Sequence, residues 1–135
     1  ADTIAVNLKD MGRSPEDCDR IITGDLGYVG QSILLDLMRK RKTDLTQNHM
    51  DCGMTIFNQQ TQDTHSGGSG CGCAATTLAA YILPKLRTGE WKRVLFVPTG
   101  ALMSTVSYNE GESVPGIAHG IVLEHEPSGK KQEVE

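Results

Sequence analysis

Four of the seven residues at positions 67–73 (Gly-Gly-Ser-Gly-Cys-Gly-Cys) are glycine, and a stretch with helical apolar spacing follows directly. So many glycines favour a turn over a continued helix or strand. Apolar residues at three- and four-residue intervals then predict a helix over 73–89, irregular or ended early at Pro84. The unbroken apolar run at 94–97 predicts a strand buried on both faces. Turn, helix and buried strand in this order indicate an α/β layer.

The rest of the chain supplies similar elements. Apolar spacing predicts helices over 1–11 and 32–42, the latter with Ile33, Leu34, Leu37 and Met38 on its apolar face. Short apolar runs predict strands over 20–23, 54–57 and 116–124. A parallel sheet built from these pieces has few strands for its helices, as though a central strand were missing.

Composition narrows the classes of function. The 135 residues suit one domain, and a net charge of −4 argues against nucleic-acid binding. The basic residues 39–42 fit the last turn of a helix. No stretch approaches the ~20 apolar residues of a membrane span, and the N-terminus lacks the pattern of a secretory signal. We therefore expect a cytoplasmic-type chain with four free thiols, either processed or a piece of something longer.

The glycine-rich run does not fit three familiar motifs. Gly70, Gly72 and Ala75 match a dinucleotide fingerprint, but no strand comes directly before them and the next strand ends without an acid. The run lacks the final glycine of a nucleophile elbow. The spacing of Cys71 and Cys73 lacks the paired cysteines of structural zinc, so we expect no metal site.

Two pairs of readings remain open for this run. In the first pair, Cys71 or Cys73 at the helix start is either an activated thiol with His65 as its base, or a small residue that allows close packing. The turn is a row of backbone N–H groups that receives an anion, helped by the Ser69 hydroxyl, or only a connection. Apart from Ser69, all residues of the run are Gly or Cys, and this composition favours a binding site over a simple connection. The remaining histidines, at positions 49, 119 and 125, are interpreted as structural or solvated.

Four segments together resemble the stage V sporulation protein AD family. They are residues 19–26 (DRIITGDL), 67–74 (GGSGCGCA), 93–104 (RVLFVPTGALMS) and 117–120 (IAHG). The resemblance runs from residue 1 to about 124 and implies a thiolase-like α/β fold with two βαβαβαββ halves. Residues 1–125 resemble most of the C-terminal half without its first, central strand, and residues 126–135 form a polar tail that we expect to be disordered.

The resemblance also implies a function without catalysis. Condensing enzymes of this fold use a His that aligns with residues 23–27 and an Asn that aligns near residues 68–70. Here the first segment has no His, and Ser69 stands in the second. The family binds dipicolinic acid, a planar pyridine dicarboxylate, for uptake as a calcium chelate into developing spores, and is connected with spore germination. The implied ligand-binding residues are Asp25, Gly68, Ser69, Gly70, Cys71 and Gly72, with no catalytic residue, metal or cofactor.

The implied partners are the ligand, the N-terminal half of the same protein, a second copy in a homodimer, and membrane proteins encoded alongside it. The implied location is peripheral, at the spore inner membrane. Two alternatives stay open: an acyltransferase with Cys71 as nucleophile, and an assembly module whose exposed sheet edge pairs with a partner.

Overall fold

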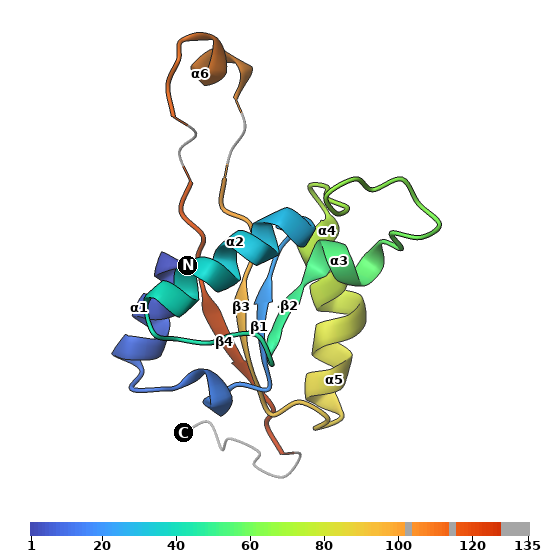
Figure 1. The fold of residues 1–135 in the computed structure, drawn as a ribbon. Helices are drawn as coiled ribbons and strands as arrows, with labels where there is room; N and C mark the ends of the chain where they lie inside the picture. Colours follow the sequence, from blue (N-terminus) through green and yellow to red (C-terminus); the bar gives the residue numbers. More distant parts are fainter. Residues whose placement is uncertain (102–103, 114–115, 128–135) are drawn as a thin grey trace, which may run out of the picture.

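The computed structural model describes residues 1–101, 104–113 and 116–127 (Figure 1). Its elements, in chain order, are α1 (Asp2–Asp10), the 3₁₀ turn η1 (Pro15–Asp17), β1 (Arg20–Thr23), α2 (Gly27–Lys40), β2 (His49–Asp51), α3 (Cys52–Ile56), α4 (Cys73–Thr77), the π-helical η2 (Leu78–Ile82), α5 (Leu83–Arg87), β3 (Arg93–Val97), α6 (Thr105–Asn109) and β4 (Ile121–Glu124). Most of the expected polar tail, residues 128–135, lies outside the described residues.

The four strands form one mixed sheet in the order β2-β1-β3-β4. β1 runs parallel to both β2 and β3, and β4 runs antiparallel to β3. The expected α/β class is therefore confirmed. A gap at the centre of the sheet is not found, because β1 pairs directly with β3 along all four of its residues. The outer strands of the described sheet are β2 and β4.

Both faces of the sheet are covered, as Figure 1 shows. Ile21 and Leu95 face one way and pack with α1 and α2. Ile22 and Phe96 face the other way and pack with α3, α4 and α5. Successive strand side chains point to opposite faces, so an unbroken apolar strand suits a sheet covered on both sides. The prediction of a fully buried strand over 94–97 is confirmed.

The predicted strand over 54–57 is wrong, because most of that segment belongs to helix α3. The Asp51 side chain accepts a hydrogen bond from the Met54 backbone N–H and caps this helix. The strand of this region is β2, which lies just before it. A short apolar run does not separate a buried helix from a strand, and here the cap decides for the helix.

Helix α2 begins at Gly27, one turn and more before the predicted start at residue 32. Leu34 and Met38 are buried as expected, but Ile33 and Leu37 are 55% and 43% exposed. The prediction is therefore wrong for these two side chains. They lie on the neighbouring side of the helix, which no described element covers.

The helix after the glycine-rich run continues through the predicted break. A π-helical turn, η2, comes directly before α5, which carries Pro84 near its start and runs to Arg87. Proline lacks the N–H that would bond to the preceding turn, and its ring crowds that turn's carbonyl. The wider π-helical turn accommodates both effects. The predicted irregularity is confirmed, and the helix does not end there.

Candidate functional site

The carboxyl ends of β1, β2 and β3 meet at one edge of the sheet, where the glycine-rich run also arrives. A Cβ on Gly24, after β1, would lie 2.5 Å from the Thr99 backbone nitrogen after β3. A Cβ on Gly53, after β2, would lie 2.0 Å from the Gly68 carbonyl oxygen. These close approaches join the loops after β1 and β3, the start of α3 and the turn into one surface. Ligands of open α/β sheets bind at this edge, outside the carboxyl ends of the strands.

Asp51 holds this edge together from inside. Its carboxylate accepts from the Thr23 hydroxyl at 2.7 Å and the Leu26 N–H at 2.9 Å through Oδ1. It accepts from the N–H groups of Gly27 at 3.2 Å and Met54 at 3.3 Å through Oδ2. One buried side chain therefore positions the starts of α2 and α3. The sequence reasoning missed Asp51, although an Asp directly before a helix is an N-cap signal.

His49 extends this network toward α2. Thr23 donates its hydroxyl proton to Asp51, so it accepts from His49 Nε2, 3.1 Å away. His49 Nδ1 then accepts from the Gln31 side-chain amide at 3.0 Å. Burial lowers the pKa of His49, and the nearby Asp51 carboxylate opposes this shift only in part. Both ring nitrogens of His49 are hydrogen-bonded within the protein, as a structural role requires, and the lowered pKa favours the neutral imidazole at neutral pH.

This network predicts a pH-dependent component of stability. Because the pKa of His49 is lowered in the folded protein, the unfolded chain takes up the proton first as the pH falls below about 6.5. The stabilisation is present above that pH and is lost as the pH falls toward the folded pKa. We expect the free energy of unfolding, measured by urea titration, to fall less between about pH 7 and pH 5 in His49→Gln than in the wild type. Equal pH slopes in the two proteins would contradict this.

Asp25 and the glycine-rich turn, both predicted site elements, are brought into contact. Asp25 Oδ2 accepts from the Gly70 N–H at 3.2 Å, and Oδ1 accepts from the Thr99 hydroxyl. The Asp25 N–H donates to the same hydroxyl at 3.3 Å. Thr99 is a site residue that the sequence reasoning missed, because its partner lies 74 positions away. One N–H of the expected anion receptor is thus occupied by the protein's own carboxylate.

The glycines of the turn fall into two groups. Gly67 has a φ of +130°, which side chains rarely adopt, and a Cβ on Gly68 would lie 1.9 Å from the Phe57 ring. Packing therefore explains these two. A Cβ on Gly70 would meet nothing within 4 Å, and one on Gly72 only the Thr76 hydroxyl at 3.8 Å. Packing does not require glycine at Gly70 and Gly72, and the lack of side chains there leaves the turn open to solvent.

The cysteines beside the turn differ in access. Cys71 is exposed, whereas Cys52 and Cys73 are buried. Burial raises the pKa of Cys73 and raises that of Cys52 to about 12. His65 Nδ1 lies 3.5 Å from the Asp63 carboxylate on an exposed loop. In the part of the chain that the structure describes, no hydrogen bond joins this imidazole to Cys71 or Cys73.

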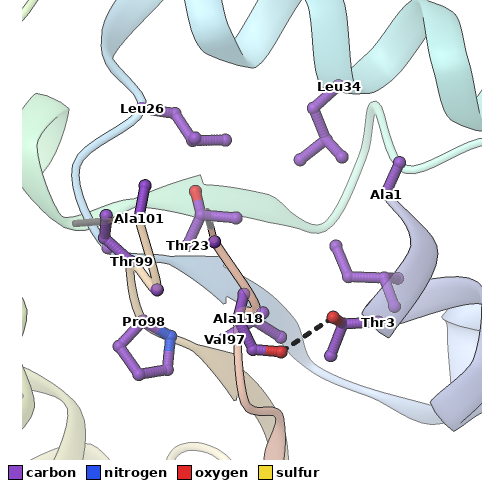
Figure 2. A pocket seen from close by; sticks show the side chains of 14 residues that line it. Ala1, Thr3, Thr23, Leu26, Leu34, Val97, Pro98, Thr99, Ala101 and Ala118 are labelled. Carbon is purple, nitrogen blue, oxygen red and sulfur yellow. Dashed lines mark hydrogen bonds between the residues drawn. The ribbon is translucent and has the colours of Figure 1, made fainter. Parts of the chain in front are cut away.

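An apolar cavity of 240 Å³ lies next to the edge, between α1, α2 and the loop after β3 (Figure 2). Leu26, Leu34 and Pro98 contribute apolar walls. Thr99, whose hydroxyl donates to Asp25, also lines the cavity. The Thr3 hydroxyl in its wall donates to the Ala118 carbonyl at 2.8 Å, the contact drawn in Figure 2. This lining suits an uncharged group. The polar groups of the edge are at Asp25 and the glycine-rich turn.

The electrostatics of the edge are negative. Among the residues that the structure describes, no Lys or Arg side chain forms a hydrogen bond or ion pair with Asp25 or Asp51. The same residues contain no group of three or more His, Cys, Asp or Glu side chains placed to hold a metal ion. Over the described ranges, no helix is both long and apolar enough to cross a membrane.

Fold and edge together define a mixed α/β protein with a glycine-rich turn and two carboxylates at the carboxyl ends of three parallel strands. A family model described as stage V sporulation protein AD matches residues 1–124. The chain is 41% identical over 124 residues to stage V sporulation protein AD of Bacillus subtilis (strain 168), an alignment that covers 92% of this chain and 36% of that protein. The chain belongs to the stage V sporulation protein AD family, whose members are sporulation proteins.

Proposed function

We propose that this chain is part of a protein that binds dipicolinic acid, as its calcium chelate, and carries it without catalysis during sporulation. The family assignment supports a role in sporulation. The observation that carries the ligand is the open turn at Gly70 and Gly72 beside the Asp25 carboxylate.

The turn offers what a flat dicarboxylate needs. Backbone N–H groups and the exposed Ser69 hydroxyl donate to carboxylate oxygens. The open space over Gly70 and Gly72 admits an aromatic ring without a side chain in its path. The carboxylate that Asp25 places on the Gly70 N–H has the same chemistry as the proposed ligand.

Charge favours the chelate over the free dianion. Two carboxylates at the edge, without a basic partner in the described residues, repel a free dianion. Calcium bound to dipicolinate removes that repulsion and leaves coordination positions for a carboxylate oxygen of Asp25. Dipicolinate then supplies most of the calcium ligands, in keeping with an edge that gathers no cluster of its own.

The proposal includes the thiolase-like fold, with this chain as most of its C-terminal half. By the resemblance, the strand that completes such a half is its first, central strand, and in the described chain β1 pairs with β3 at the centre of the sheet instead. The N-terminal half then forms the other wall of the pocket. The proposal also includes a homodimer and a peripheral position at the spore inner membrane beside its membrane partners.

Calorimetric titration with dipicolinate, with and without Ca²⁺, tests the ligand on the intact protein and on residues 1–135. We expect binding that strengthens at least tenfold, by about 1.4 kcal/mol, when Ca²⁺ is present. Heat from the intact protein alone would place the pocket between the halves. No heat from the intact protein in either condition would end the proposal.

Gly70→Val tests the place of binding. A Cβ at this position meets nothing within 4 Å, and a Val side chain extends into the approach to the turn. We therefore expect dipicolinate affinity to fall at least tenfold while stability stays within about 0.5 kcal/mol. Ser32→Val on the exposed side of α2 is the matched control and keeps full affinity. Equal affinity in the two variants would move the site away from the turn.

Incubation with an acyl-CoA distinguishes the acyltransferase alternative from the proposed non-catalytic binding. Exposed Cys71 is the thiol that a reagent reaches first, because burial raises the pKa of the other three. A stoichiometric thioester on Cys71 that prior alkylation prevents would replace the binding proposal with acyl transfer.

A further inference from the structure

Two cysteines flank Gly72 at the start of α4, and they differ in access. All four cysteines lie among the described residues, and Cys71 is the exposed one. Cys73 is the first residue of α4 and is 5% exposed. Its thiol lies 3.9 Å from the Gly24 carbonyl oxygen, to which it donates a weak hydrogen bond. One thiol therefore meets solvent, and the other is packed against the loop after β1.

This difference in access suits the two steps of thiol oxidation. An oxidant in solution reaches the exposed thiol first, because oxidation of cysteine follows exposure. Burial raises the pKa of Cys73, which keeps this thiol from reacting directly. The space over Gly70 and Gly72 is open, so a molecule as small as a peroxide can approach the turn. Oxidation therefore begins at Cys71, and Cys73 is the next thiol along the chain.

The chain between the two cysteines can bring their sulfur atoms together. Two trans peptide bonds hold their Cα atoms within about 7 Å, near the separation of about 5.5–6 Å found in disulfides. The buried thiol must then turn outward, which requires a change in the backbone at Gly72. A Cβ on Gly70 would meet nothing within 4 Å and one on Gly72 only the Thr76 hydroxyl at 3.8 Å, so no neighbouring group blocks this change. The bonds that break are those from the Cys73 N–H to the Gly70 carbonyl, at 3.0 Å, and from the Thr76 N–H to the Gly72 carbonyl, at 2.8 Å.

We propose that Cys71 and Cys73 are a redox-sensitive pair, which a peroxide converts into a reversible disulfide. The Cys71 thiolate attacks one oxygen of the peroxide, the O–O bond breaks, and Cys71 becomes a sulfenic acid as hydroxide leaves. The Cys73 sulfur then attacks the Cys71 sulfur, and the sulfenic oxygen leaves as water with the proton of Cys73. Two electrons pass from the pair of thiols to the peroxide. Exchange with a dithiol reductant breaks the S–S bond and restores both thiols.

The disulfide loosens the edge of the sheet, because the Cys73 sulfur cannot keep its packed position and also bond to Cys71. Its hydrogen bond to the Gly24 carbonyl is lost, and the first turn of α4 unwinds. Gly24 precedes Asp25, whose carboxylate accepts from the Gly70 N–H, so both sides of that contact change. A disulfide that strains its surroundings is easily reduced, which makes the change reversible. The inference does not rest on the ligand, and a protein that bound no dipicolinate would still form this disulfide.

Peptide mapping of the intact protein after treatment with hydrogen peroxide tests the disulfide. Proteolytic cleavage after Phe57 separates Cys52 from the other two cysteines, so a bond between Cys71 and Cys73 leaves one peptide that has lost two hydrogen atoms. Dithiothreitol restores the mass of this peptide.

Dimedone, which labels sulfenic acids, tests the order of the two steps. It labels Cys71 strongly in Cys73→Ala and weakly in the wild type, where Cys73 consumes the sulfenic acid. Cys71→Ser is the matched control and keeps Cys73 reduced. Equal labelling of Cys71 in the wild type and Cys73→Ala, a disulfide from Cys71 to Cys52 or to another chain, or an unchanged peptide mass would overturn the proposal.

Hydrogen exchange measures the effect of the disulfide on the edge. We expect the backbone N–H groups of Cys73 and Thr76 to exchange about tenfold faster in the oxidised protein, because both lose their hydrogen bonds in the turn. Reduction with dithiothreitol restores the slower rates. The Cys71→Ser protein, treated with peroxide in the same way, keeps the rates of the reduced wild type. Equal rates in the oxidised and reduced wild type would contradict the loosening of the edge.

Discussion

Asp51→Ala is expected to lower the free energy of unfolding by about 3–4 kcal/mol, measured by urea titration at neutral pH. The change removes a buried acceptor from four donors, three of them backbone N–H groups at the starts of α2 and α3. Each buried donor left without a partner costs about 1–3 kcal/mol, reduced where water enters the edge. The bond from the Met54 N–H is also the N-cap of α3, so this cost includes the loss of that cap.

Two further substitutions sharpen the result. Asp51→Asn keeps one acceptor oxygen but turns an NH₂ group toward N–H donors, so most of the loss remains. Asp36→Ala removes an exposed carboxylate that pairs with Arg39 on the surface, and costs less than about 0.5 kcal/mol. If Asp51→Ala were as mild as Asp36→Ala, the carboxylate would not organise the edge.

Gly53→Ala is expected to cost about 2–3 kcal/mol and to disturb the turn as well. Its Cβ would lie 2.0 Å from the Gly68 carbonyl oxygen, so backbone must move. The movement changes the turn that carries Gly70, so under the proposed function dipicolinate affinity falls together with stability. Urea titration measures the first effect and calorimetry the second.

Gly72→Ala provides the matched comparison. Its Cβ would approach only the Thr76 hydroxyl, at 3.8 Å, so the protein keeps its stability or gains up to about 1 kcal/mol from a less flexible unfolded chain. A Gly53→Ala protein as stable as Gly72→Ala would mean that the start of α3 and the turn are not in contact.

The α/β class was predictable because its strongest signals are local. The apolar run of β3 predicts burial on both faces from its own residues, and no information on the neighbouring strands is needed. β2 was missed because only Met50 of its three residues is a large apolar side chain. Pairing with β1 makes it a strand, and no local pattern carries that information.

The candidate site was predictable where residues adjacent in sequence carry it. The turn was recognised from its glycines, whereas Asp25 was predicted only through the family resemblance. Thr99 and Asp51 were not, because their contacts with the Asp25 loop join segments 74 and 24–28 positions apart. Ile33 and Leu37 of α2 were wrongly placed on the covered face for a related reason, because apolar spacing predicts a covered face but not how wide the cover is.

Because the Asp25 carboxylate already accepts from the Gly70 N–H, a ligand carboxylate that binds this N–H has to displace the Asp25 carboxylate. A carboxylate tethered a few ångströms from its donor competes at an effective concentration of about millimolar or more. An incoming carboxylate therefore gains a hydrogen bond only as an internal one breaks. Calcium changes that balance, because the released Asp25 oxygens then have a cation to bind. Under the proposed function, loading would then depend on the supply of chelate rather than on total dipicolinate, and the contact between Asp25 and Gly70 would form again when the chelate leaves.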